Sequence, residues 1–96
     1  MAIETYYSQV AEEIVSNFKS GVILDLGTGP GYLPIEIVRR APDINIIGVD
    51  LSRKLIQMAQ TNAAKAGLSH QLSFETGNAA GLHFDNATFD MVINTG

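Results

Sequence analysis

The sequence predicts an α/β fold built on an open, parallel β-sheet. Two short apolar runs, at residues 22–26 and 45–49, and an alternating run at 72–75 are separated by segments with helical spacing of apolar residues. Near-continuous apolar runs of this length are typical of strands buried in parallel sheets. Strands joined by such helices predict right-handed βαβ units. A fourth short run, at residues 91–94, predicts one more strand.

The first apolar run leads into a glycine-rich turn. Asp25 lies near the end of the run, and Gly27, Gly29 and Gly31 follow at alternate positions. Glycine permits a tight turn, and without Cβ atoms a ligand can approach the backbone closely. Because a helix is expected directly after the turn, its free N–H groups should face the same space. This combination predicts a site for a nucleotide-type cofactor.

The spacing of the glycines separates two classes of cofactor. Dinucleotide-binding folds use the pattern G-x-G-x-x-G, but here Tyr32 occupies the third glycine position. A fragment that binds NAD(P) or a flavin is therefore the less favoured alternative. The pattern D-x-G-x-G-x-G at residues 25–31 resembles motif I of the class I S-adenosylmethionine-dependent methyltransferases and matches it at every defined position.

A second acidic residue, Asp50, ends the second apolar run, 19 positions after Gly31. This is close to the spacing of about 20 residues at which an acidic residue meets the ribose of a bound nucleotide. One carboxylate can accept hydrogen bonds from both ribose hydroxyls. The alternative is a loop residue that assists the cap of the next helix at Ser52. The glycine turn upstream favours the ribose.

The leading segment, residues 1–20, predicts an amphipathic helix, and residues 21–96 form the core of the domain. Thr5 is the predicted N-cap of this leading helix, and apolar residues recur after Thr5 at helical spacing. Tyr6 and Tyr7 are expected on its buried face. The alternative, implied by the resemblance, is that one of them covers the cofactor.

Two further helices are delimited by their end signals. The helix after the glycine turn carries Pro34 in its first turn and should stop before Pro42. The next helix should begin at Ser52 as N-cap and end at Gly67.

The resemblance extends over residues 6–96 through four ordered segments, at residues 25–31, Asp50, 77–79 and 89–94. It is greatest for small-molecule methyltransferases of the ubiquinone and menaquinone biosynthesis type. The resemblance implies a Rossmann-like open parallel sheet with strand order 3-2-1-4 and flanking helices, expected on both faces. It also implies truncation, because the family's fold has seven strands and this chain ends after the fourth.

The resemblance implies S-adenosyl-L-methionine as cofactor and S-adenosyl-L-homocysteine as product, at the carboxyl ends of the first three strands. Asn78 stands where the family has an acidic residue on the adenine amino group, and an amide oxygen can accept the same hydrogen bond. No catalytic residue is predicted, because methyl transfer from a sulfonium mainly requires alignment of the reacting atoms. The residues implied to bind the cofactor are Asp25, Gly27, Thr28, Gly29, Gly31, Asp50, Leu51, Asn78, Ala79 and Asn94.

Composition argues against several other classes. The chain has six basic and ten acidic residues, a net charge of −4, which gives little support for binding nucleic acid. It has no cysteine, which excludes a disulfide framework or a thiolate metal site and fits the cytoplasm. No apolar run approaches the ~20 residues of a membrane span. His70 and His83 have no partners at metal-ligand spacing, so no metal is expected.

The acceptor side of the site cannot be recognised in the sequence. The expected acceptor is a small molecule, and the 96-residue chain alone should bind the cofactor weakly and transfer no methyl group. A non-catalytic cofactor-binding or interaction module is the alternative. The strand at residues 91–94 should form an exposed apolar edge, which predicts self-association as a homodimer.

Overall fold

The computed structural model describes residues 3–77 and 89–94 of the chain. Helices and strands alternate along the first part of the sequence, and one strand follows at the end. The elements are α1 (Ile3–Asn17), β1 (Gly21–Leu26), α2 (Tyr32–Arg40), β2 (Ile44–Asp50), α3 (Arg53–Ala66), β3 (Leu72–Thr76) and β4 (Met91–Asn94).

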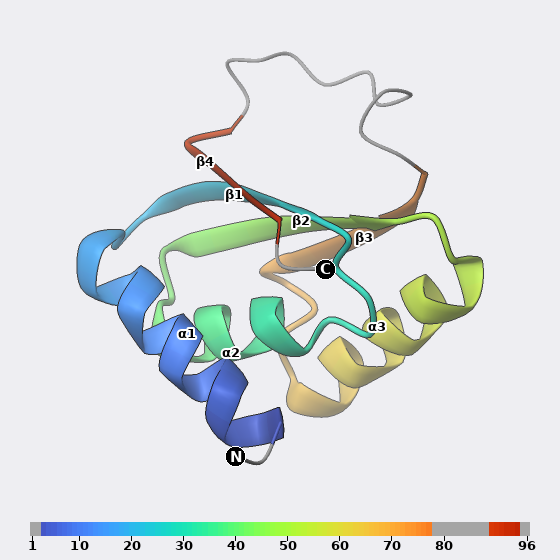
Figure 1. The fold of residues 1–96 in the computed structure, drawn as a ribbon, viewed down its shortest axis with the longest axis horizontal. Coiled ribbons are helices and arrows are strands. Elements are labelled where there is room, and N and C mark those ends of the chain that lie inside the picture. Colours follow the sequence, from blue (N-terminus) through green and yellow to red (C-terminus); the bar gives the residue numbers. More distant parts are fainter. Residues whose placement is uncertain (1–2, 78–88, 95–96) are drawn as a thin grey trace.

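The strands form one parallel sheet in the order β3-β2-β1-β4 (Figure 1). The predicted order is confirmed, and β1 lies inside the sheet between β2 and β4. In register, Leu26 of β1 lies beside Val49 of β2 and Asn94 of β4. The carboxyl ends of these strands therefore meet where the strand order reverses, which is the usual ligand-binding position in open α/β sheets.

The helices of the described residues all cover one face of the sheet, so the expectation of helices on both faces is wrong for this part of the chain (Figure 1). The crossovers β1-α2-β2 and β2-α3-β3 step in the same direction along the sheet. Right-handed crossovers in one direction place their helices on the same face. The β3 to β4 connection steps back past β1, and its residues 78–88 lie outside the described part.

The hydrophobic core lies between the sheet and this helix layer. Alternate residues of β1 and β2, Ile23, Ile44 and Ile46, are buried there. The predicted apolar stripes of α2 and α3 face them. Those stripes contribute Leu33, Ile37, Val38, Ile56, Ala59 and Ala63 to the same cluster.

The helix ends follow the sequence signals at three of four predicted positions. α2 ends at Arg40, before Pro42. Ser52 caps α3 by accepting a hydrogen bond from the backbone N–H three residues later, and Gly67 closes the helix at φ 73°. The prediction of Thr5 as N-cap of α1 is wrong, because α1 is already helical at Ile3. Threonine is tolerated inside helices at a modest cost, so its presence alone does not mark a start.

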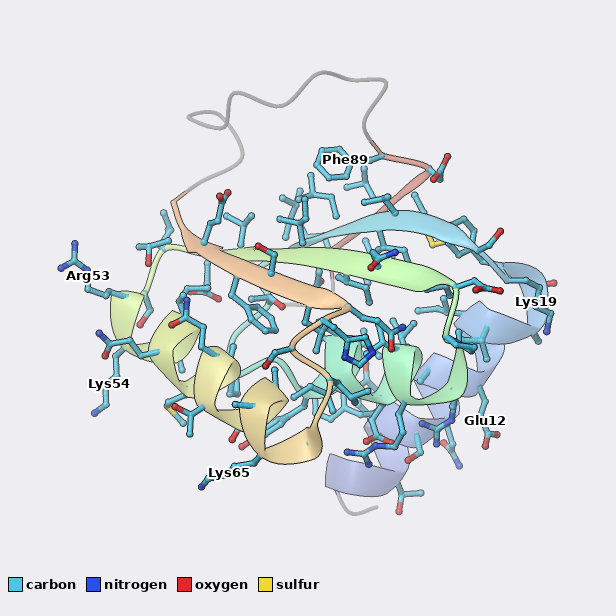
Figure 2. The ribbon with its side chains drawn as sticks, turned by 180° about the vertical axis from the view of Figure 1, so that it is seen from behind. Glu12, Lys19, Arg53, Lys54, Lys65 and Phe89 are labelled. Atoms are coloured by element: carbon cyan, nitrogen blue, oxygen red, sulfur yellow. The ribbon has the colours of Figure 1, made fainter. Side chains whose placement is uncertain are left out.

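Charged side chains lie on the outer surface of the helix layer. Figure 2 shows Arg53, Lys54 and Lys65 pointing away from α3 into solvent. Within residues 3–77 and 89–94, no helix is long and apolar enough to cross a membrane.

Candidate functional site

A pocket of about 290 Å³ lies at the carboxyl ends of β1, β2 and β4; we call it the front pocket. The polypeptide brings its walls together because parallel strands end at the same edge of the sheet. The residues that line it are Leu26, Gly27, Val49, Asp50, Leu51, Gly77 and Asn94. Leu51 projects freely, with 74% of its surface exposed.

Asp50 connects the glycine turn to the start of α3. Its Oδ2 accepts a hydrogen bond from the backbone N–H of Gly29 at 2.9 Å, and its Oδ1 accepts one from the N–H of Ser52 at 2.9 Å. The sequence left two roles open for Asp50, and the contact with Ser52 shows that it does assist the cap. A carboxylate has about four acceptor positions, so each oxygen can still accept a further hydrogen bond from a ligand.

Asp25 lies behind the glycine turn, between the sheet and the helix layer, rather than in the front pocket. It is only 1% exposed, and its Oδ2 accepts a hydrogen bond from the Thr28 hydroxyl at 2.7 Å. Its Oδ1 is buried without a hydrogen-bond partner among the described residues. Burial raises the pKa of the Asp25 carboxyl to about 6; the Thr28 bond opposes this rise and the nearby charge of Asp50 adds to it.

Gly48 makes room for this buried pair, and Gly31 makes room for the residues packed beside it. A Cβ atom at Gly48, the neighbour of Asp25 on β2, would lie 2.6 Å from Oγ1 of Thr28 and 2.8 Å from the ring of Phe74. A Cβ at Gly31, which has φ 82°, would lie 3.1 Å from both Phe74 and Ala59. Gly31 therefore permits the start of α2 to pack closely against α3 and β3, as the third glycine of such turns often does.

A second pocket, of about 340 Å³, lies on the helix side of the glycine turn; we call it the side pocket. The backbone of Gly27, Gly29 and Pro30 forms one wall, and Tyr7 and Tyr32 form another. The two tyrosine rings lie 5.8 Å apart between centroids. Tyr7 is half-buried beside the glycine turn, whereas Tyr6 is 48% exposed, so the expectation of a buried position is wrong for Tyr6.

The predicted site residues do not all line one pocket. Gly27 and Asp50 line both the front and the side pocket, and Leu51 and Asn94 line the front pocket alone. Thr28 and Gly29 line the side pocket alone, while Asp25 and Gly31 line neither and lie behind the turn. Asn78 and Ala79 lie outside the described residues.

Sequence reasoning missed several residues of this region. Leu26, Val49 and Gly77 line the front pocket, and Gly48 supports the turn from behind. Gly48 had a signal, because a glycine inside a strand often marks close approach of another group. In the described part of the chain, no three His, Cys, Asp or Glu side chains are grouped to hold a metal ion.

The family of methyltransferase domains matches residues 23–96 of this chain. The match includes the glycine turn, Asp50, most of β1 and all of β2, β3 and β4. The chain therefore belongs to this family, and the predicted membership among the class I S-adenosylmethionine-dependent methyltransferases is confirmed.

Known proteins with related sequences and structures carry the same assignment. The chain is 37% identical over 70 residues to demethylmenaquinone methyltransferase of Deinococcus radiodurans, covering 73% of this chain and 28% of that protein. It is 37% identical over 73 residues to release factor glutamine methyltransferase of Staphylococcus aureus, covering 71% of this chain and 26% of that protein. The chain therefore spans just over a quarter of the length of these relatives.

A solved structure with a bound ligand is also similar. It is the SAM-dependent methyltransferase of Thiobacillus denitrificans in complex with S-adenosyl-L-homocysteine, with a TM-score of 0.78 and 26% identity. The alignment covers 95% of this chain and 36% of that one.

Proposed function

We propose that this chain is the cofactor-binding part of an S-adenosylmethionine-dependent methyltransferase and that the front pocket holds the cofactor. The observation that carries the proposal is Asp50, whose carboxylate lies at the end of β2 beside the glycine turn with acceptor capacity left for a ribose diol. The similarity to a structure that contains S-adenosyl-L-homocysteine supports the same cofactor.

In this proposal each lining residue has a separate task. Asp50 accepts hydrogen bonds from the ribose hydroxyls, and Leu51 packs on the adenine together with Asn78 and Ala79. Gly27 and Asn94 lie beside the methionine end, where Gly27 has no Cβ to collide with it. Asp25, Thr28 and Gly31 hold the turn in shape from behind. Gly29 contributes its N–H to Asp50.

The cofactor would supply an activated methyl group on a sulfonium, and the chain would align that methyl group with the acceptor. The described residues around the front pocket form no acid–base pair, since Asp50 is bound to two backbone N–H groups and Asp25 is buried behind the turn. Preorganised binding is sufficient for this chemistry, because transfer depends mainly on holding donor and acceptor in line.

We further propose that the acceptor is a small molecule. The similarity to a demethylmenaquinone methyltransferase supports this class. Thr95 follows Asn94, so the Asn-Pro-Pro-Tyr motif of enzymes that methylate adenine or glutamine amino groups is not present. The net charge of −4 favours a partner other than nucleic acid, and the cysteine-free sequence supports the cytoplasm as its compartment.

The 96-residue chain is proposed to bind the cofactor weakly and to be inactive alone, because it spans just over a quarter of its enzymatic relatives. A non-catalytic cofactor-binding module is the alternative.

Calorimetric titration with S-adenosyl-L-homocysteine and with NAD⁺ tests the proposed cofactor. We expect S-adenosyl-L-homocysteine alone to bind, and preferential binding of NAD⁺ would contradict the proposed cofactor. Methyl transfer by the purified chain would contradict the proposed inactivity.

The edge of the sheet at β4 is proposed to pair with a second copy of the chain. β4 ends the sheet order, and Val92 is 57% exposed there. An uncovered strand edge presents free N–H and C=O groups to another strand. Light scattering at micromolar concentration is expected to show a dimer, and a stable monomer would contradict this pairing.

A further inference from the structure

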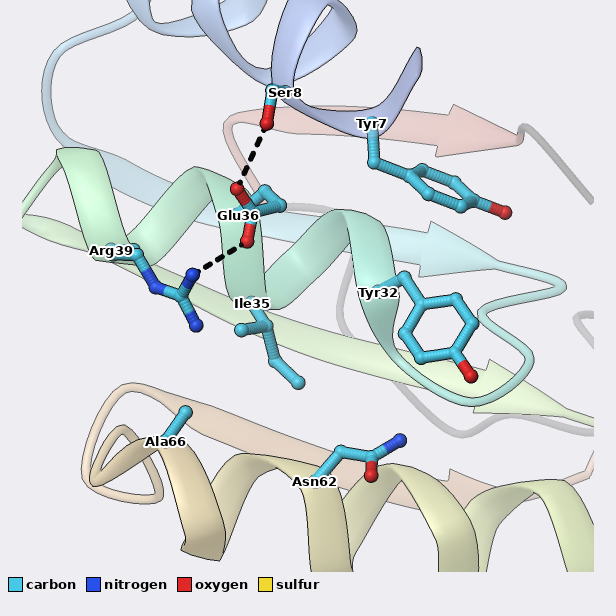
Figure 3. A pocket seen from close by; sticks show the side chains of 8 residues that line it. All are labelled: Tyr7, Ser8, Tyr32, Ile35, Glu36, Arg39, Asn62 and Ala66. Carbon is cyan, nitrogen blue, oxygen red and sulfur yellow. Dashed lines mark hydrogen bonds and ion pairs between the residues drawn. The ribbon is translucent and has the colours of Figure 1, made fainter. Parts of the chain in front are cut away.

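A third pocket, of about 550 Å³, lies among the three helices on the outer side of α2; we call it the helix groove (Figure 3). Tyr7 and Ser8 reach it from α1, and Asn62 and Ala66 reach it from α3. Its volume is within the range of pockets that hold small organic ligands. It shares no lining residue with the front pocket, but it shares Tyr7 and Tyr32 with the side pocket beside the glycine turn.

One end of the helix groove is aromatic. The rings of Tyr7 and Tyr32 lie 5.8 Å apart between centroids and are tilted by 57° (Figure 3). Neither hydroxyl makes a hydrogen bond within the described part of the chain. Ile35 and Ala66 continue the groove beyond the rings with apolar surface. An aromatic ring can pack here in offset or edge-on contact with the tyrosines.

The other end of the helix groove is lined by an ion pair, Arg39 and Glu36, and Arg40 binds the same glutamate from outside the lining. Arg39 and Arg40 both donate to the carboxylate of Glu36, each at 2.9 Å, and Ser8 donates to it at 3.3 Å. One carboxylate thus faces two guanidinium groups, and Glu12, 4.0 Å from Arg40, is mostly exposed to solvent. Arg39 is about half exposed and uses one of its five N–H donors on Glu36.

The spacing between the two ends selects the size of ligand. Tyr32 and Arg39 are seven residues apart on α2, which places them on one face of the helix about 10 Å apart. Asn62 lines the groove from α3 and donates to the carbonyl of Pro30, and its Oδ1 accepts no hydrogen bond from the described residues. A flat apolar body about two rings long, with an anionic group at one end, fills this distance.

We propose that the helix groove binds a planar aromatic carboxylate, with its rings against Tyr7 and Tyr32 and its carboxylate on Arg39. Guanidinium and carboxylate groups form strong, charge-assisted hydrogen bonds. Because the charge of Glu36 is already compensated by two arginines and the carboxylate also accepts from Ser8, a cationic ligand would gain little from it. The site is independent of the proposed function, since no cofactor is needed to form it.

The test is calorimetric titration of the 96-residue chain with 2-naphthoate in the absence of cofactor. Binding is expected, and 2-naphthalenemethanol and cyclohexanecarboxylate, which lack the charge and the aromatic rings respectively, should each bind at least about tenfold more weakly. Arg39→Gln should weaken naphthoate binding by about tenfold or more, whereas Arg53→Gln, the matched control on the outside of α3, should leave it unchanged.

A second readout locates the ligand. The chain has three tyrosines and no tryptophan. Labelling with 3-fluorotyrosine should therefore give three ¹⁹F signals, of which those of Tyr7 and Tyr32 should shift most with naphthoate. Equal binding of the neutral alcohol, an unchanged Arg39→Gln affinity in a folded variant, or unshifted Tyr7 and Tyr32 signals would each overturn the proposal. Displacement of naphthoate by S-adenosyl-L-homocysteine would also overturn the proposal. If S-adenosyl-L-homocysteine does not bind the chain at all, that result counts against the proposed function and not against the naphthoate site.

Discussion

The front and the back of the glycine turn are built in different ways. In front, Leu51 is largely exposed and Asp50 is half-buried with acceptor capacity left over. Behind, Asp25 and Thr28 are bonded to each other and buried, over a glycine that leaves no room for one more carbon atom. The glycine motif itself is divided in this way, because Gly27 lines the front pocket whereas Asp25 and Thr28 hold the turn from behind. The two groups should respond differently to substitution.

The largest effect is expected behind the turn, from Gly48→Ala. The added Cβ would lie 2.6 Å from Oγ1 of Thr28 and 2.8 Å from the ring of Phe74, and both residues are buried. Overpacking of this kind should lower the free energy of unfolding by about 3 kcal/mol, measured by urea denaturation. Gly67→Ala is the control, because φ is 73° there but no atom lies within 4 Å, so only about 1 kcal/mol should be lost. Equal losses would show that Gly48 has no special steric role.

Asp25→Asn should change how stability depends on pH. The pKa of Asp25 is raised to about 6 in the folded chain, so the folded state binds its proton more tightly than the unfolded state does. The stability that Asp25 contributes is therefore complete below pH 4 and is lost as the pH rises through 6. Between pH 4 and pH 7 the native chain should lose roughly 2–3 kcal/mol relative to Asp25→Asn. Parallel pH profiles in chemical denaturation would contradict the burial argument.

In front of the turn, Asp50→Ala should mainly reduce affinity. Loss of hydrogen bonds from ribose hydroxyls to a carboxylate should weaken S-adenosyl-L-homocysteine binding by about 1.5–3 kcal/mol, measured by calorimetry. Asp43→Ala, an exposed aspartate at the opposite end of β2, is the matched control and should bind normally. Asp50→Ala should also lose some stability, because Gly29 and Ser52 lose their acceptor. A less stable variant with unchanged affinity would leave Asp50 only its structural role.

The smallest effect is expected from Leu51→Ala. Leu51 is 74% exposed, so its removal should change stability by less than about 0.5 kcal/mol. If its side chain packs on the adenine, affinity should fall by about 1 kcal/mol. Met58→Ala, at another exposed apolar position, is expected to change neither quantity. If Leu51→Ala lowers the free energy of unfolding by more than it lowers the free energy of binding, the proposed difference between the front and the back of the turn is contradicted.

Sequence alone predicted most of the fold, because apolar runs and helix-end signals predicted the elements and the family resemblance implied the strand order. The side chains that face the ligand were harder to recognise. Asp25 and Asp50 lie near and at the ends of apolar runs, and the register places Asp25 beside Gly48, so both carboxylates point to the same face of the sheet. Asp25 is buried because it lies within β1, whereas Asp50 is the last residue of β2 and stays accessible. Gly48 was overlooked because its role depends on Thr28, which is distant in sequence and contacts it only in the fold. The expectation of helices on both faces came from the complete family fold, not from residues 3–77.

The central claim is that the ligand binds in front of the turn while the motif residues behind it serve as support. An ¹⁵N–¹H chemical-shift map during titration with S-adenosyl-L-homocysteine tests this most directly. We expect the largest shifts at the amides of Leu26, Gly27, Leu51 and Asn94, with much smaller shifts at Ala59 behind the turn. Largest shifts around Tyr32 and Asn62 in the helix groove, or none at the front pocket at saturating ligand, would contradict the account.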